Sequence, residues 1–199
     1  NEICSCPKCG PRLSLLDNTG QPFEGDPVSL AIDFLRRGKI LAIKNQGGVH
    51  LVCDARNAAA VSLLRERRQN DEKPFHVMFA NANSASTYVQ IGIGEPGLLA
   101  MPERPVILLK KRSSCDAALP GVTPGTVWLG VMTPCTPLQY LLFHEAAGRP
   151  EGLNWLDQPQ ELALAMSAAD SDREIPATRN EEALQRLSGI ADAFLLHDC

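Results

Sequence analysis

Hydrophobic residues recur along the chain at two spacings, one typical of helices and one typical of strands. The first helical set is Val28, Ala31, Ile32 and Leu35. Asp26 suits the N-cap of this helix, Pro27 its first position and Gly38 its end. The same spacing predicts further helices over residues 57–68, 84–89, 137–147 and 180–187.

Short apolar runs between these segments predict the strands. They cover residues 39–44, 50–53, 75–80, 105–109, 127–132 and 193–196. Helices and strands alternate irregularly, which favours an α+β (mixed α/β) fold over a strictly doubly wound parallel sheet. We therefore expect a twisted, mixed β-sheet covered by helices. In residues 148–161 the hydrophobic positions follow neither the helical nor the strand spacing.

The first 25 residues are rich in Cys, Gly, Pro and Asp and predict an appendage plus linker, so that the fold proper begins at residue 26. A net charge of -4 argues against unselective nucleic-acid binding, which needs many cations against phosphates. No apolar run is long enough to cross a bilayer, and the N-terminus has no secretory pattern. These features favour a cytoplasmic protein without a membrane partner.

The seven cysteines do not form the pattern of a disulfide framework. Cys6 and Cys9 have the spacing of half a zinc site, but a structural zinc ion requires four ligands. Two alternatives remain. Cys4 supplies a third ligand and another group a fourth, or the pair is an empty half-site and Zn²⁺ binds only in a complete parent protein.

Five sequence blocks resemble the YrdC-like domain of HypF-type carbamoyltransferases and the end of the zinc module before it. They are CPKCGPRLSLLDNTG, LAIKNQGGVHLVCDA, the run from VCDA through LRERR to KPFHVMFA, WLGVMTPCTPLQYLL and NEEALQRLSGIADAFLLH. Order and spacing both agree with that family, and agreement over several blocks is far more specific than one short motif. The resemblance implies a zinc-module remnant at 1–25 and a YrdC-like domain at 26–199.

The resemblance also implies a reaction. In a whole HypF protein, one domain releases carbamate from carbamoyl phosphate, and the YrdC-like domain joins carbamate to AMP from ATP, giving carbamoyl adenylate and pyrophosphate. A further domain passes the carbamoyl group to a HypE-like acceptor protein during maturation of nickel-iron hydrogenases. This chain is expected to perform the middle step, with ATP and Mg²⁺ bound.

Adenylation needs cations around the phosphates, and the resemblance places several candidates along the chain. Lys44 ends a predicted strand, Gly47 and Gly48 follow it, and His50 occupies the family's histidine position. The glycines alone would indicate only a tight turn. His50 is interpreted either as a catalytic contact to nucleotide or carbamate, or as a hydrogen-bonded structural residue.

A basic run follows in Arg65, Arg67, Arg68 and Lys73. The resemblance assigns this run, together with Gly47 and Gly48, to nucleotide binding, and it assigns Lys44 a catalytic role. Lys73 precedes Pro74 at a helix-to-strand junction, where the family has a phosphate-contacting lysine, so it is assigned a catalytic and nucleotide-binding role. For Arg65, a solvated helix face is the simpler interpretation.

The chain departs from the family at two motifs. A Lys-x-Arg pair corresponds to Arg68, Gln69 and Asn70, and a TSGN-like loop corresponds to Ser167, Ala168, Ala169 and Asp170. Ser167 and Asp170 are assigned to nucleotide binding. The carboxylate of Asp170 would repel a triphosphate unless Mg²⁺ bridges the two. Residues 151–164 form an insertion that is either a lid or a divergent surface loop.

Two alternatives to the enzymatic interpretation follow. A degenerate domain would bind nucleotide weakly or act as a docking scaffold. RNA binding ranks last, because the chain is acidic and poor in aromatic residues.

Overall fold

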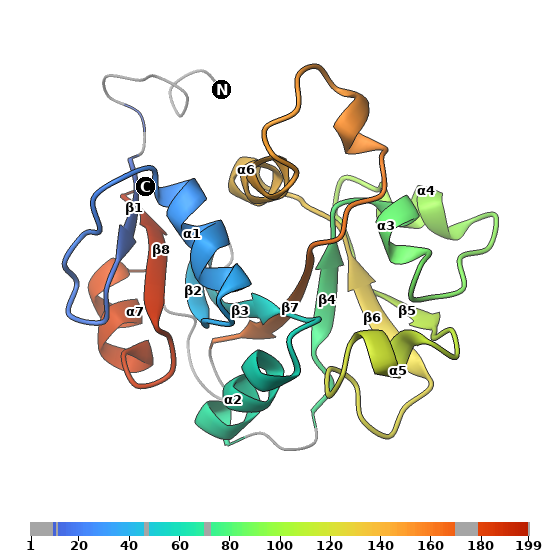
Figure 1. Cartoon of the computed structure of the whole chain (residues 1–199), viewed down its shortest axis with the longest axis horizontal. Coiled ribbons are helices and arrows are strands. Elements are labelled where there is room, and N and C mark those ends of the chain that lie inside the picture. Colours follow the sequence, from blue (N-terminus) through green and yellow to red (C-terminus); the bar gives the residue numbers. More distant parts are fainter. Residues whose placement is uncertain (1–9, 11, 46–47, 70–72, 170–178, 199) are drawn as a thin grey trace.

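The structure, a computed structural model, describes residues 10, 12–45, 48–69, 73–169 and 179–198 (Figure 1). Among these residues, strands form one mixed sheet in the order β1-β8-β2-β3-β7-β4-β6-β5. The strands are β1 (Leu13–Leu16), β2 (Leu41–Asn45), β3 (Gly48–Asp54), β4 (His76–Phe79), β5 (Ile107–Lys110), β6 (Trp128–Met132), β7 (Ala163–Ala168) and β8 (Ala193–His197). Only the β2/β8 and β4/β6 pairs are parallel. The predicted mixed sheet is confirmed.

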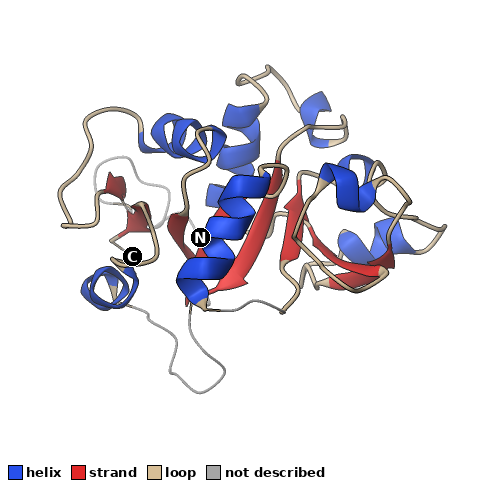
Figure 2. Ribbon diagram, turned by 60° about the horizontal axis from the view of Figure 1, so that its bottom comes forward, coloured by secondary structure: helices blue, strands red, loops and turns tan. Residues whose placement is uncertain are grey.

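Helices cover both faces of this sheet, as Figure 2 shows. They are α1 (Pro27–Arg36), α2 (Ala58–Arg68), α3 (Ala82–Ala85), α4 (Glu95–Leu99), α5 (Cys115–Ala118), α6 (Pro137–Ala146) and α7 (Asn180–Leu187), with a 3-10 turn η2 (Asn154–Leu156). Buried side chains of α2 and α7 belong to one core, and those of α1 and α6 to the other. We call the two sides of the sheet the α2 face and the α1 face.

The start of α1 agrees with the sequence prediction. Asp26 is the N-cap, and its carboxylate accepts a hydrogen bond from the backbone N–H of Val28. Partial burial opposes ionisation of this carboxyl. Hydrogen bonds from Val28, the Ser29 hydroxyl and Arg149 outweigh it, and the pKa of Asp26 is lowered. Arg149 also contacts Glu145, so this cluster ties α1 to α6.

Two strands lie where the sequence analysis predicted none. β7 is central, between β3 and β4, and its alanine-rich apolar run is buried on both faces. Such a strand lacks the alternation that marks a half-exposed one, and alanine has low strand propensity. β1 pairs with β8 and buries Leu15, so the sheet includes residues before residue 26, where the fold was expected to begin.

The segment predicted to be an insertion, residues 151–164, runs into β7, because its last two residues already belong to that strand. Asn81, just before α3, donates through its amide to the carbonyls of Leu156 and Gln158, which anchors the segment. In the described part of the chain, no helix has the length and apolar character needed to span a bilayer.

Candidate functional site

Several neighbouring strands have one end at the same place, beside the C-terminal end of α2 (Figure 1). β2 and β7 end there, and β3 and β4 begin there. On the two sides of β7, His50 pairs with Ala168 and His76 pairs with Met166. We call these strand ends, together with the end of α2 and Lys73, the hairpin edge. Most predicted site residues that the structure describes lie here.

Lys44 and His50 lie at this edge but on opposite faces of the sheet. Lys44 pairs with Val49, whose side chain belongs to the core on the α2 face. His50 pairs with Ile43, which belongs to the core on the α1 face. Because side chains alternate along a strand, the two candidates do not approach one reacting atom from the same side.

Lys44 is buried, and its ammonium group is held by protein groups. Nζ donates to Asn180 Oδ1 at 2.8 Å and to the carbonyl oxygen of His197 at 3.2 Å. Asn180 Nδ2 donates to the same carbonyl at 3.1 Å. Lys44 therefore joins the end of β2 to the start of α7 and the end of β8.

His50 is half-buried on the α1 face. Its Nδ1 lies 3.2 Å from Nδ2 of Asn45, the last residue of β2. Asn45 Oδ1 in turn lies 3.4 Å from Nε2 of Gln139, in the first turn of α6. Neither Asn45 nor Gln139 was among the residues predicted from the sequence. The T-x-x-Q pattern that begins at Thr136, a capping-box signature, was the available signal.

The residues at the end of β7 also divide between the two faces. Ser167 pairs with Leu51 on the α2 face, and its hydroxyl lies 3.5 Å from the Ala168 carbonyl. Ala168 pairs with His50 and is exposed. Arg68, at the end of α2, donates through Nη1 to the carbonyl oxygen of Ala168. Arg68 therefore contacts the end of β7, where the resemblance predicted the counterpart of the TSGN-like motif.

Arg65 is not on a solvated helix face, and that interpretation is wrong. Its side chain is buried, with the guanidinium group 4.3 Å from the centre of the Phe75 ring. Nε donates to the carbonyl of Gly121, Nη2 to that of Val122 and Nη1 to that of Lys73, at 2.8, 2.9 and 2.9 Å. Its three nitrogens thus bind backbone carbonyls. Arg65 therefore holds the backbone of Lys73, and Lys73 itself is exposed at the hairpin edge.

Arg67 points away from Arg68. Its Nη1 donates to the carbonyl of Ile190 at 2.7 Å and contacts Asp192 Oδ1 at 3.1 Å, which ties α2 to the turn before β8. Gly48 has a φ of 127°, a conformation that side chains other than glycine rarely adopt, as the predicted turn requires. The remaining predicted residues, Gly47, Asp170, Cys6 and Cys9, lie outside the described residues.

Beyond His50, the α1 face of β4, β6 and β5 carries exposed apolar residues. Leu108, Val106 and Trp128 are all exposed. The ring of His76 lies over Gly130, where an added Cβ would come within 2.6 Å of His76 Cδ2. Desolvation by neighbouring groups lowers the pKa of His76.

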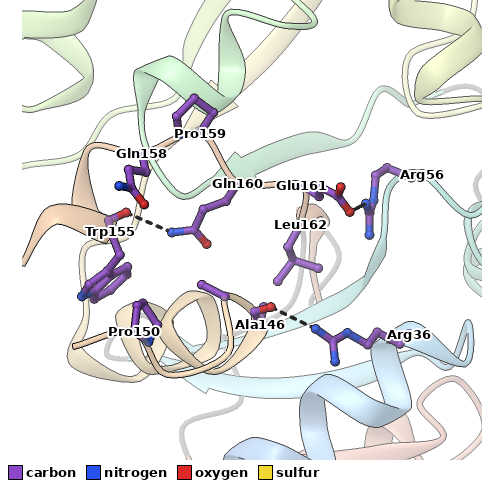
Figure 3. A pocket seen from close by; sticks show the side chains of 11 residues that line it. Arg36, Arg56, Ala146, Pro150, Trp155, Gln158, Pro159, Gln160, Glu161 and Leu162 are labelled. Atoms are coloured by element: carbon purple, nitrogen blue, oxygen red, sulfur yellow. Dashed lines mark hydrogen bonds and ion pairs between the residues drawn. The ribbon is translucent and has the colours of Figure 1, made fainter.

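Two cavities lie away from the hairpin edge. The cavity in Figure 3, of about 330 Å³, is bounded by α1, α6 and residues 155–162. Its arginines already have protein partners: Arg36 donates to the carbonyl of Ala146, and Arg56 contacts Asp54 and Glu161. The other cavity, of about 690 Å³, lies beside α3, α4 and η2. None of the predicted site residues lines either cavity, so the hairpin edge remains the candidate site.

Comparison with known proteins identifies the family and the fold. Residues 33–199 match the Sua5/YciO/YrdC family, which is described as telomere recombination. The chain belongs to this family. Its sequence is 59% identical over 187 residues to carbamoyltransferase HypF2 of Cupriavidus necator, covering 94% of this chain and 23% of that protein. It is 38% identical over 194 residues to carbamoyltransferase HypF of Rhodobacter capsulatus, covering 98% of this chain and 24% of that protein.

Two solved HypF structures have the same fold as this chain. Full-length HypF in a phosphate- and nucleotide-bound form has a TM-score of 0.81 at 33% identity, covering 97% of this chain and 23% of that one. HypF of T. kodakarensis has a TM-score of 0.82 at 34% identity, covering 96% and 23%. The chain thus spans about a quarter of the length of these Sua5/YciO/YrdC relatives, and the predicted likeness to the YrdC-like part of HypF is confirmed.

Proposed function

We propose that this chain is the carbamoyl-adenylate-forming domain of a HypF-like carbamoyltransferase that acts in nickel-iron hydrogenase maturation. The supporting observation is the 59% identity to HypF2, which extends over 94% of the chain. The similar full-length HypF structure is a phosphate- and nucleotide-bound form, which favours a nucleotide as one substrate here.

In the proposed reaction, an oxygen of carbamate attacks the α-phosphorus of ATP. A new phosphorus–oxygen bond forms, the bond from the α-phosphorus to the bridging oxygen breaks, and pyrophosphate leaves. Little covalent chemistry falls to the protein, so catalysis rests on positioning and on countering negative charge. The hairpin edge offers Arg68 and Lys73 as cations and His50 as a hydrogen-bonding group. Lys44, held by Asn180, contributes its charge from the α2 face.

The proposal assigns Mg²⁺ to the phosphates of ATP and Zn²⁺ to the complete parent protein. Among the described residues, no three His, Cys, Asp or Glu side chains are grouped for metal binding. Mg²⁺ is therefore expected to arrive bound to the phosphates of ATP, as this ion commonly does. Zn²⁺ is assigned to the complete parent protein. Carbamoyl phosphate and a HypE-like acceptor are also assigned to that parent as its substrate and partner, because this chain spans about a quarter of the length of its relatives.

A second candidate function is a degenerate domain that serves as a docking scaffold. Ala168 favours it, because an exposed methyl group faces the same side as His50 where the family motif has a serine hydroxyl. Without that hydroxyl, one phosphate contact is absent.

Calorimetric titration of Mg²⁺·ATP into this chain separates the two candidates. The enzymatic proposal predicts binding that Lys73→Ala weakens by about 10- to 100-fold, the worth of one hydrogen bond to a charged group. Lys39→Ala is the matched control, because Lys39 is also exposed but precedes β2 at the opposite end of the sheet. If wild type shows no heat at millimolar ATP, or if both variants bind equally, the nucleotide site proposed here is wrong.

A further inference from the structure

The start of α6 fixes the orientation of one buried side-chain amide. Gln139 is 5% exposed and forms a capping box with Thr136. Its Oε1 accepts hydrogen bonds from the backbone N–H of Cys135 at 2.8 Å and of Thr136 at 3.2 Å, and it lies 3.3 Å from the Cys135 thiol. Backbone N–H groups only donate, so the end of the amide that faces them must be the oxygen.

The rest of the amide then points to β2. Gln139 Nε2 donates to Asn45 Oδ1 across 3.4 Å. An asparagine amide that accepts on one side presents its NH₂ group on the other. That NH₂ group lies 3.2 Å from His50 Nδ1. The polarity of the whole chain of contacts, from α6 to β3, is therefore set by two backbone N–H groups.

This polarity restricts the imidazole. Because Asn45 offers a donor, His50 Nδ1 has to be an acceptor, and the proton of the neutral ring resides on Nε2. Protonating Nδ1 would place two donors against each other. We propose that Gln139 is a positioning residue that acts through Asn45 to hold His50 in its neutral Nε2–H form, as a hydrogen-bond donor at the hairpin edge.

The ligand of this donor follows from the proposed function, on which this part of the inference rests. An N–H donor suits an anionic oxygen, either of carbamate or of the phosphate under attack. A ring in the other tautomer would present a lone pair from Nε2 and repel the same oxygen. The tautomer itself does not depend on the proposed function.

Gln139→Glu tests the inference without nucleotide. A carboxylate still accepts from the N–H groups of Cys135 and Thr136, so the helix cap is retained, but it cannot donate to Asn45. Asn45 then turns its NH₂ group toward residue 139 and its oxygen toward His50, which requires a proton on Nδ1. Ring ¹⁵N and ¹³C chemical shifts report the tautomer at about pH 8, where imidazole is ordinarily neutral.

The expected result is an Nε2–H ring in wild type and a shift to Nδ1–H in Gln139→Glu. Gln185→Glu, an exposed change on α7, serves as the matched control and should leave the ring unchanged. Asn45→Asp is an independent variant, since its second oxygen would face Nδ1 and should produce the same shift. An Nδ1–H ring in wild type, or a tautomer that neither variant changes, overturns the inference.

A second readout links the tautomer to catalysis. Carbamate-dependent exchange of pyrophosphate into ATP should fall about ten-fold in Gln139→Glu, the size of one lost hydrogen bond to a charged group. If the tautomer shifts as expected while wild type shows no exchange, the positioning of His50 stands and the proposed adenylation fails. If exchange is present and insensitive to the shifted tautomer, the catalytic part of the inference fails.

Discussion

Replacing Arg65 with alanine should destabilise this domain far more than a typical charged residue on a helix would. The arginine joins α2 to two distant segments by donating to the carbonyls of Gly121, Val122 and Lys73. Its guanidinium group also packs on Phe75. Alanine would remove all of these contacts at once and leave backbone acceptors without their donor.

The magnitude follows from these contacts. A hydrogen bond from a charged donor contributes about 1.5–3 kcal/mol, and three would sum to about 4.5–9 kcal/mol. Such contributions are not additive at one side chain. Gly121 is exposed, so water can replace one of the bonds. We therefore expect a loss of about 3–5 kcal/mol in the free energy of unfolding, or roughly 10 °C in Tm for a domain of this size.

Urea unfolding followed by circular dichroism measures this loss. Arg37→Ala is the control, because Arg37 forms only an exposed pair with Asp33 on α1 and should cost less than about 0.5 kcal/mol. Arg65→Lys keeps the charge but not the fork of donors and should fall between the two. A loss below about 1 kcal/mol for Arg65→Ala would refute the structural role given to this residue.

Three further predictions concern the hairpin edge, the thiols and the first helix. Ala168→Ser restores a hydroxyl across from His50 and should tighten Mg²⁺·ATP binding about ten-fold in calorimetry. Burial raises the pKa of Cys53 to about 12, so iodoacetamide at about pH 8 should spare it and modify exposed Cys135, as read by peptide mass spectrometry. Asp26→Ala should cost about 1 kcal/mol at neutral pH through loss of the α1 cap. Because folding lowers the pKa of Asp26 from 3.8, the part of that cost that depends on the carboxylate charge is fully present above about pH 4 and is lost as the pH falls through the folded-state value.

Each of these predictions has a contrary outcome. Equal ATP affinities for Ala168→Ser and a surface change such as Ala147→Ser would remove residue 168 from the site. Similar alkylation rates for Cys53 and Cys135 would show that the core around β3 opens easily. A cost of Asp26→Ala that stays constant in urea unfolding from neutral to acidic pH would show that the carboxylate charge does not stabilise α1.

The sequence predicted the elements whose signals are local. Asp26 and Pro27 mark the start of α1, and the observed helix begins there. The helix predicted over residues 180–187 coincides with α7. β7 escaped prediction because its alanine-rich run is buried on both sides and shows neither helical spacing nor alternation.

The candidate site was less predictable because it depends on long-range contacts. Arg65 belongs to a charged helical run, and only the carbonyls of residues 121 and 122, more than fifty positions away, reveal that it is buried. Lys44 and His50 are close in sequence, but the hairpin register places them on opposite faces. Gln139 lies 94 residues from Asn45, so their contact leaves no trace in local spacing.

Carbamate-dependent exchange of labelled pyrophosphate into ATP tests the central claim most directly, with this chain, Mg²⁺ and ammonium carbamate as the source of carbamate. Formation of a carbamoyl adenylate predicts that label enters ATP only when carbamate is present, and that Lys73→Ala reduces the rate while Lys39→Ala does not. Exchange that is absent in wild type, or that proceeds equally without carbamate, would contradict the account.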